Sequence, residues 1–468
     1  MKILYKSKFL LLGMVALSLQ SCFVAKDYKR PENVVPQQNL FRTDELPQDS
    51  LSMAEVSWRD MFTDPVLDSY IEKGLQNNLD VRIALQQILA AEAYVKQGKA
   101  GFLPTLGISG QVTHQELSKN SQLGSFLNGT SDQFDVTANL SWEADIWGKI
   151  RSNKRAFEAS YLQSVAAHQA IKTRLIANIA TSYYQLLALD EQKRITETTI
   201  ETRQKGLETT QALKEAGNVT EVGVKQTEAQ LYTAKAILID INNEIRLLEN
   251  SLSILLGEAP QDIQRGDLNE QEITTDLEVG VPMQLLKNRP DLIAAEYNLV
   301  NAFELTNVAR SNFYPSLRLT ANGGFQSIDI DKLFSVNSLF ATLVGSLTEP
   351  IFNGRKIRTQ YEVAQSQKEQ AALNFEKSLL TAGKEVSDAL YNYKASTDKI
   401  EVKTMEFQAY SDATGYSEEL LKNGYANYLE VLTARQNALS SQLDLVNARF
   451  NQLKSVVDLY RALGGGWR

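Results

Sequence analysis

Cysteine and histidine are nearly absent from this chain of 468 residues, which contains one cysteine and two histidines. A single cysteine cannot form an internal disulfide, and a cysteine-rich metal site is excluded outright. The two histidines, His114 and His168, lie 54 residues apart with no carboxylate–serine constellation nearby, so we interpret both as structural or surface groups. We therefore expect no metal, no cofactor and no enzymatic activity.

An excess of basic charge and long apolar segments are lacking as well. The 48 lysines and arginines are outnumbered by 56 aspartates and glutamates, and the net charge of −8 argues against a nucleic-acid-binding surface. The mean hydropathy of −0.26 excludes a protein with many membrane-spanning helices. The apolar run from Phe9 to Leu19 is too short to cross a bilayer as a helix.

The N-terminus instead has the pattern of a secretory signal peptide, because three lysines (Lys2, Lys6 and Lys8) precede that apolar run. The run leads to Ser21 and Cys22, and a small residue directly before the single cysteine resembles the lipobox of bacterial lipoproteins. We expect a lipoprotein signal peptide over 1–21, lipidation of Cys22 and an extended tether over 22–57. The alternative is an ordinary signal peptide with a chance cysteine.

The remaining chain repeats itself. Four landmarks recur in order at a nearly constant offset of about 207 residues, which makes chance similarity improbable and indicates a tandem duplication far longer than a solenoid repeat. The paired landmarks are 102–106 with 313–317, 145–151 with 350–358, 213–217 with 420–424, and 256–257 with 463–464. We place the first repeat at 58–257, a connector at 258–282 and the second repeat at 283–468.

Both repeats have the same predicted order of elements. A helix, over 66–100 and 283–311, ends where a proline follows. Two strands come next, with polar and apolar residues alternating, over 105–116 and 132–144 and again over 316–327 and 338–349. A very long helix without proline follows, over 149–214 and 355–421, and after a glycine turn a second helix with a heptad seam returns. The seams require partner helices, in the same chain or in another.

The four strands have the length of tilted transmembrane strands, but four strands cannot close a barrel. Because an open sheet edge is not tolerated in lipid, several chains must share one barrel. Aromatic residues at the junctions between helices and strands fit an interfacial girdle. They are Phe102, Trp142, Trp147, Phe313, Tyr314 and Phe352. The alternative is a soluble β-sandwich lid with these aromatics in its core.

Several motifs, taken in order, resemble the TolC-like outer-membrane factors, specifically the lipoprotein branch that serves resistance-nodulation-division efflux pumps. The motifs are Cys22, 58–65, 142–149, 288–292 and 459–467, and they span essentially the whole mature chain. The resemblance implies a mainly α-helical trimer in which four strands per chain form a shared 12-stranded barrel on a long periplasmic tunnel. It further implies a passive exit duct in the outer membrane that docks onto a periplasmic adaptor and an inner-membrane pump.

The resemblance also places a gate at the helical tips, where carboxylates can form a ring that favours cations. Members commonly carry Asp where this chain has Thr433, so Glu430 becomes the candidate carboxylate, with Tyr425 and Tyr428 as candidate plugs. An exposed helix charge without a gating role is the competing interpretation of Glu430. For adaptor docking we predict the tip residues Gly217, Asn218, Gly424 and Asn427 within the loops 214–222 and 421–428.

Two other functions stay open at this point. A duct of the same design could export proteins through a type I system, although the lipobox and the resemblance favour efflux of small molecules such as drugs, toxic compounds or metal ions. A lipid-anchored coiled-coil scaffold without a pore would need no barrel, and the alternating strands count against it.

Overall fold

The structure is a computed structural model that describes residues 24–31, 40, 42, 52–126, 130–271 and 282–467. The predicted signal peptide and Cys22 lie outside the described residues. The chain divides into two compact units. Unit 1 contains residues 1–31, 88–164 and 295–375, and unit 2 contains 32–87, 165–294 and 376–468. Each unit takes segments from both halves of the chain, so a compact unit is not the same thing as a sequence repeat.

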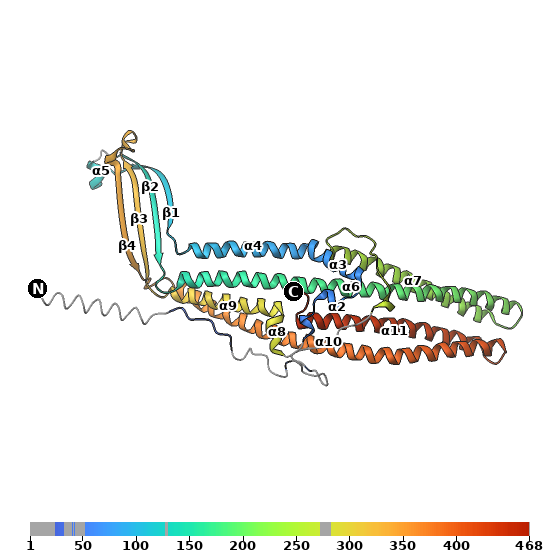
Figure 1. Cartoon of the computed structure of the whole chain (residues 1–468). Coiled ribbons are helices and arrows are strands. Elements are labelled where there is room, and N and C mark those ends of the chain that lie inside the picture. Colours follow the sequence, from blue (N-terminus) through green and yellow to red (C-terminus); the bar gives the residue numbers. More distant parts are fainter. Residues whose placement is uncertain are drawn as a thin grey trace. The chain divides into compact units, whose positions relative to one another are not determined.

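Unit 1 contains a four-stranded antiparallel sheet in the order β1-β2-β3-β4, which confirms the predicted strands (Figure 1). The strands are β1 (Thr105–Glu116), β2 (Thr130–Ala144), β3 (Ser316–Ser327) and β4 (Leu339–Thr348). The short helix α5 (Gln122–Phe126) follows β1, and two 3-10 turns, η4 (Ile330–Lys332) and η5 (Val336–Ser338), lie between β3 and β4. Within the described chain, β1 and β4 each pair along one edge only.

The two central strands approach each other closely at one glycine. A Cβ added to Gly324 would lie 2.0 Å from the carbonyl oxygen of Val136, so no larger residue fits there without moving β2 or β3. A Cβ at Gly345 on β4 would meet nothing within 4 Å. The glycine at 324 is therefore required by strand packing, whereas the one at 345 is not.

The helices of unit 1 contact residues 24–31, which belong to the segment predicted to be a tether. These helices are the later part of α4 (Leu79–Ala100), the beginnings of α6 (Lys149–Glu215) and α10 (Lys356–Lys422), and most of α9 (Pro290–Ser311). The Asn307 amide on α9 accepts from the Lys26 backbone N–H at 3.2 Å and donates to the Lys26 carbonyl at 2.9 Å. Arg30 donates to both carboxylate oxygens of Glu296, at 2.7 and 2.6 Å. Residues 24–31 thus lie along α9.

Unit 2 contains two antiparallel helical hairpins, α6 with α7 (Glu221–Leu255) and α10 with α11 (Tyr428–Leu463) (Figure 1). Shorter elements accompany them: η2 (Met53–Glu55), α2 (Trp58–Met61), α3 (Pro65–Asn77), η3 (Leu268–Glu270) and α8 (Pro282–Asn288). Met53 and Ala54 are buried, so the end of the segment expected to be an extended tether forms a packed turn instead.

The helices expected over 66–100 and 283–311 are each broken in two. Asn78 ends α3 and caps α4, because its Oδ1 accepts from the N–H groups of Asp80 (2.9 Å) and Val81 (3.2 Å). Its amide nitrogen donates to the Leu255 carbonyl at 2.9 Å, a contact that ties the break to the end of α7. In the second repeat, Arg289 separates α8 from α9.

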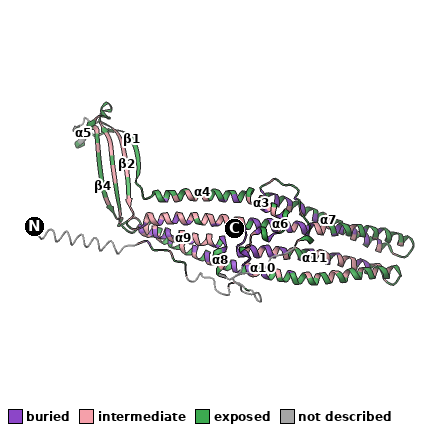
Figure 2. Cartoon of the chain, viewed as in Figure 1, coloured by how far each residue is buried: buried purple, intermediate pink, exposed green. Residues whose placement is uncertain are grey.

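Buried residues of unit 2 occur on all four hairpin helices and on the short helices (Figure 2). Buried side chains of α6 include Tyr183 and Ile179, and seam positions such as Ile245 on α7 and Val457 on α11 are buried as well. The seams therefore have partner helices within the chain. Glu249, next to the seam position Leu248, is also buried and is compensated by Arg265, whose Nη1 donates to its carboxylate at 2.7 Å.

Candidate functional site

The two hairpin turns have the same chemistry, as the duplication requires. Gly217 and Gly424 adopt φ angles of 81° and 79°, a left-handed conformation that favours glycine after a helix end. In the first turn the Asn218 N–H donates to the Leu213 carbonyl at 2.8 Å, and in the second the Tyr425 N–H donates to the Leu420 carbonyl at 2.9 Å. Gly217, Asn218, Gly424 and Asn427 are all exposed at these tips.

The candidate gate carboxylate, Glu430, lies in the first turn of α11. The Asn427 side chain caps this helix by accepting from the Glu430 N–H at 3.1 Å, and its amide donates to the Glu430 carboxylate at 3.1 Å. A negative charge in the first turn also interacts favourably with the helix dipole. Glu430 is exposed, and Thr433, one turn further on, is exposed with its hydroxyl donating to the Leu429 carbonyl at 2.9 Å.

The two candidate tyrosines differ in their surroundings. Tyr425 is 84% exposed at the turn, whereas Tyr428 is half-buried and its hydroxyl has no hydrogen-bond partner among the described residues. Tyr428 lines a groove of about 910 Å³ between the ends of the two hairpins, together with residues such as Thr209 and Asn218 of the first hairpin. The structure therefore brings Tyr428 to the groove and leaves Tyr425 on the tip surface.

An ion pair next to this groove was not predicted from the sequence. Arg435 of α11 donates from Nε (2.8 Å) and Nη2 (2.6 Å) to one carboxylate oxygen of Glu418 on α10. A Cβ added to Gly206 of α6 would lie 2.9 Å from the Arg435 Nη1. The glycine thus leaves room for the arginine where the two hairpins meet.

A second arginine, Arg203, lies one turn before Gly206 on α6 and is buried, with 3% of its surface exposed. Its Nη1 donates to the Gln230 carbonyl at 2.5 Å and its Nη2 to the Gln436 side-chain oxygen at 2.9 Å. Burial, followed by the positive charge of Arg435, lowers the pKa of this guanidinium. In the sequence, nothing distinguishes Arg203 from the other basic residues of this long helix.

The predicted interfacial aromatics cluster in unit 1, where the strands meet the helices. The indole of Trp142 donates to the Phe102 carbonyl at 3.0 Å, and the indole of Trp147 donates to the Pro315 carbonyl at 2.7 Å. Trp147 also packs against Tyr314, with ring centroids 5.0 Å apart. Phe313 packs edge-on against Tyr361 at 5.6 Å. Phe352 is 92% exposed.

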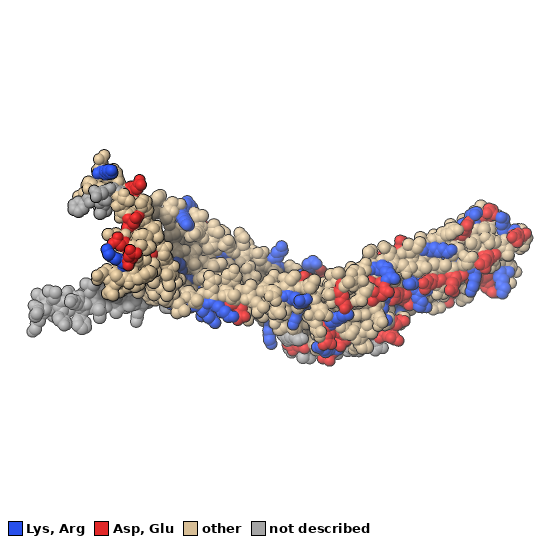
Figure 3. Space-filling model, turned by 90° about the horizontal axis from the view of Figure 1, so that it is seen from above, with Lys and Arg blue, Asp and Glu red and all other residues tan. Residues whose placement is uncertain are grey.

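The helices of unit 2 carry basic and acidic side chains interspersed (Figure 3). Several are paired, such as Lys225 with Glu228 at 2.8 Å and Lys403 with Asp444 at 3.0 Å. Among the described residues, no group of three or more metal-binding side chains is arranged to hold a metal ion. In the same part of the chain, no helix combines the length and apolarity needed to cross a membrane.

The duplicated helical hairpins and the four-stranded sheet fall within the part of the chain that matches a known protein family. The sequence profile described as Outer membrane efflux protein matches residues 70–258 and 281–465. The chain therefore belongs to this family of outer-membrane efflux channels and is not an enzyme.

Individual relatives match over at least 95% of their length. The probable efflux pump outer membrane protein TtgC of Pseudomonas putida is 30% identical over 461 residues, covering 97% of this chain and 95% of TtgC. The cation efflux system protein CusC of Escherichia coli K12 is 27% identical, covering 97% of this chain and 98% of CusC. The probable outer membrane lipoprotein SilC of Salmonella typhimurium is 25% identical over 99% of this chain and 100% of SilC.

Solved structures agree with these relatives. A crystal structure of CusC superposes with a TM-score of 0.83 at 26% identity, covering 95% of this chain and 100% of that one. The open state of the MtrE outer membrane channel of Neisseria gonorrhoeae superposes with a TM-score of 0.83 at 25% identity, covering 96% and 99%.

Proposed function

We propose that three copies of this chain form one 12-stranded barrel and one helical tunnel, which serve as the exit duct of a tripartite efflux system. The observation that carries this proposal is the sheet itself, because β1 and β4 each pair along one edge only within the described chain. Unpaired strand edges cannot remain open in lipid, so β1 of one copy would pair with β4 of the next.

The distribution of apolar side chains on the edge strands supports this arrangement. Leu106, Ile108 and Val112 of β1 are 69%, 79% and 69% exposed, and Leu343 of β4 is 70% exposed. Alternate residues of a strand share one face, so these apolar residues lie on one face of each edge strand. On the opposite face of β1, the Ser109 hydroxyl lies 2.9 Å from the Thr137 hydroxyl of β2, whereas the opposite face of β4 mixes Thr342 and Ser346 with Phe340 and Val344. In a barrel the apolar face would contact lipid and the polar face the lumen.

The finer assignments follow from this duct. The lipidated Cys22 would anchor the chain in the outer membrane, and the aromatic cluster around Trp147 and Tyr314 would lie at the membrane interface. The exposed tips would dock onto a periplasmic adaptor, which links the duct to an inner-membrane pump of the resistance-nodulation-division type. The repeats 58–257 and 283–468 would each contribute one hairpin and two strands. CusC is named as a cation efflux protein, and the TtgC of another Pseudomonas putida strain is named as part of a toluene efflux pump, so we propose cations or small toxic compounds as substrates.

At the tips we propose that Glu430 lines the pore and favours cations, with Tyr425 and Tyr428 narrowing the entrance. Three carboxylates in a confined pore attract cations and repel anions. Glu430 is exposed and held on the first turn of α11 by Asn427, which gives its charge a defined place in each copy.

The test of the duct is the native mass of the protein extracted from outer membranes in mild detergent, with Leu343→Arg and Thr342→Arg as a matched pair. We expect three chains for the native protein. An arginine on the lipid face costs about 2–4 kcal/mol at the bilayer centre, so L343R should lose the assembled form while T342R, on the opposite face, keeps it. A native monomer, or protein that washes off the membrane once Cys22 is changed to Ser, would leave only the pore-less scaffold.

A further inference from the structure

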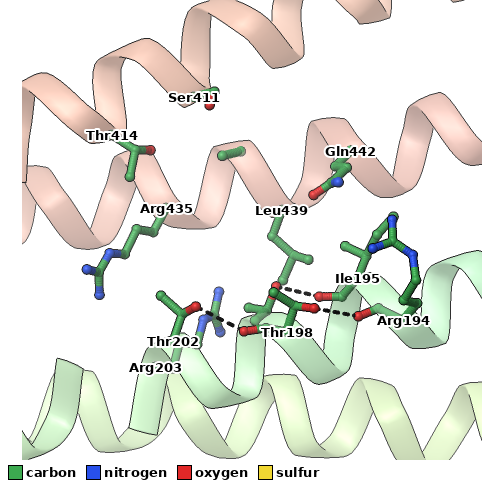
Figure 4. Close-up of a pocket in the computed structure, with 12 residues that line it drawn as sticks. Arg194, Ile195, Thr198, Thr202, Arg203, Ser411, Thr414, Arg435, Leu439 and Gln442 are labelled. Carbon is green, nitrogen blue, oxygen red and sulfur yellow. Dashed lines mark hydrogen bonds between the residues drawn. The ribbon is translucent and has the colours of Figure 1, made fainter. Parts of the chain in front are cut away.

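A small cavity of about 230 Å³ lies in unit 2 between α6, α10 and α11 (Figure 4). It shares only Thr202 and Arg435 with the lining of the groove at the tips. Three arginines border it: Arg194 and Arg203 from α6 and Arg435 from α11. The other lining side chains are neutral, and no aspartate or glutamate is among them. The cavity therefore has cationic and neutral polar groups in its walls, beside the apolar side chains of Ile195, Ala438 and Leu439.

Two of the three arginine charges are compensated. Arg194 donates to both carboxylate oxygens of Glu191 at 2.7 Å, and Arg435 donates to Glu418. Arg203 contacts only the neutral oxygens of Gln230 and Gln436, and its Nε has no hydrogen-bond partner among the described residues. The cavity therefore carries about one uncompensated positive charge.

An uncompensated charge at this depth is costly. Arg203 is 3% exposed, and the desolvation penalty of a buried ion in a protein is several kcal/mol unless a counter-charge repays it. The neighbouring Arg435 adds repulsion, and the direction of the pKa shift at Arg203 agrees with both effects. A negative charge placed in the cavity would relieve the penalty and the repulsion together.

The remaining walls suit a small anion. Ser411 of α10 and Gln442 of α11 bring a hydroxyl and an amide to the cavity from the side opposite α6 (Figure 4). The hydroxyls of Thr198 and Thr202 donate to carbonyls of their own helix, both at 3.0 Å, so they offer the cavity no further donor. Charge-assisted hydrogen bonds to arginine are about twice as strong as neutral ones.

We infer that this cavity binds a small oxyanion or carboxylate, with Arg203 supplying the charge and Ser411 and Gln442 the neutral donors. The bound anion would bridge α6 of the first hairpin to α10 and α11 of the second, beside the direct link from Arg203 to Gln436. Anion binding should therefore restrain the seam between the hairpins. The inference uses contacts within one chain and does not depend on the number of chains in the barrel.

The test is a phosphate titration of the purified full-length protein in detergent, with sodium chloride at matched ionic strength as the reference. We expect a saturable rise in the thermal midpoint and slower amide exchange in 195–206 and 435–442. Arg203→Gln should weaken the apparent phosphate affinity by at least about tenfold, because the charge-assisted contacts are lost. Arg174→Gln, an exposed arginine on the same helix, should leave it unchanged.

Gln442→Leu provides a second variant that keeps Arg203, and it should weaken phosphate binding by a smaller factor. Acetate is the carboxylate probe: competition with phosphate would assign both ligand classes to the cavity, and phosphate binding that acetate leaves unchanged would assign oxyanions alone. A phosphate effect equal in all variants, or no effect beyond that of chloride in the native protein, would overturn the inference.

Discussion

The buried arginine between α8 and α9 offers a sharp test of how the second repeat is held together. Arg289 donates from Nε and Nη2 to Asp291 (3.0 and 2.6 Å), and from Nη1 to Glu385 on α10 (2.7 Å) and to the Ala462 carbonyl on α11 (3.0 Å). Its side chain is 6% exposed. The perturbation is Arg289→Met, which keeps the apolar stem and removes all of these donors at once.

The magnitude follows from what the substitution leaves behind. Breaking a buried ion pair by removing one partner costs about 3–5 kcal/mol when the remaining charge stays buried. Here the Asp291 and Glu385 side chains are 49% and 26% exposed, so water solvates both carboxylates in part, and Glu385 also keeps Arg461 at 3.6 Å. The lost hydrogen bond to the buried Ala462 carbonyl adds about 1 kcal/mol or more. We expect a total of about 2–4 kcal/mol.

Native-state hydrogen exchange measures this locally, in residues 282–292 and 456–466. The free energy of opening should fall by about 2–4 kcal/mol in R289M, and R289M combined with Glu385→Gln should recover part of it. Arg461→Met is the matched control, because Arg461 is 33% exposed and contacts the same carboxylate. It should cost less than about 1 kcal/mol. A loss below about 1 kcal/mol in R289M would refute the reasoning that this network joins the three helices.

Three further predictions concern the sheet, the tip and a buried carboxylate. Gly324→Ala should lower the yield of assembled protein, because the new Cβ lies 2.0 Å from the Val136 carbonyl, whereas Gly345→Ala should behave as the native chain; equal yields on native gels would contradict this. Glu430→Gln should reduce cation preference and Thr433→Asp should increase it, as read from reversal potentials across a salt gradient in planar bilayers; unchanged potentials in both would remove Glu430 from the pore. Burial raises the pKa of Glu304 above its ordinary value of 4.5, so the folded chain binds this proton more tightly than the unfolded chain does. The corresponding stability is present below pH 4.5 and is lost as the pH rises through the raised pKa, and Glu304→Gln should flatten that part of the pH profile of unfolding.

Local signals explain which parts of the fold could be predicted. The alternation in 134–142, Pro104 and Pro315 after their helices, and the glycines at both turns act within a few residues, so the strands, long helices and tips are readable from the sequence. The break at Asn78 is not, because its amide bonds to the Leu255 carbonyl 177 residues away while apolar residues continue on both sides. Tertiary contact decides that boundary.

The same distinction applies to the site. Glycine turns mark the tips, and the aromatic junctions follow the strand ends, so those residues could be identified as candidates. Arg203, Arg435 and Glu418 could not, because a charged residue on a helix of 36 or 67 residues has the same sequence signal whether it faces water or the other hairpin. Only the packing of α6 against α10 and α11 separates a buried arginine from a solvated one.

The edge strands described above also bear on how the protein must be made. Before β1 and β4 pair with strands of other copies, a newly exported chain would present two rows of unpaired backbone groups beside exposed leucine and isoleucine side chains. Strand edges of this kind template aggregation. In the proposed arrangement, a chain that has not yet assembled is therefore prone to associate wrongly through these edges. Pairing β1 of one copy with β4 of the next would remove both edges, so assembly itself would protect the protein from aggregation.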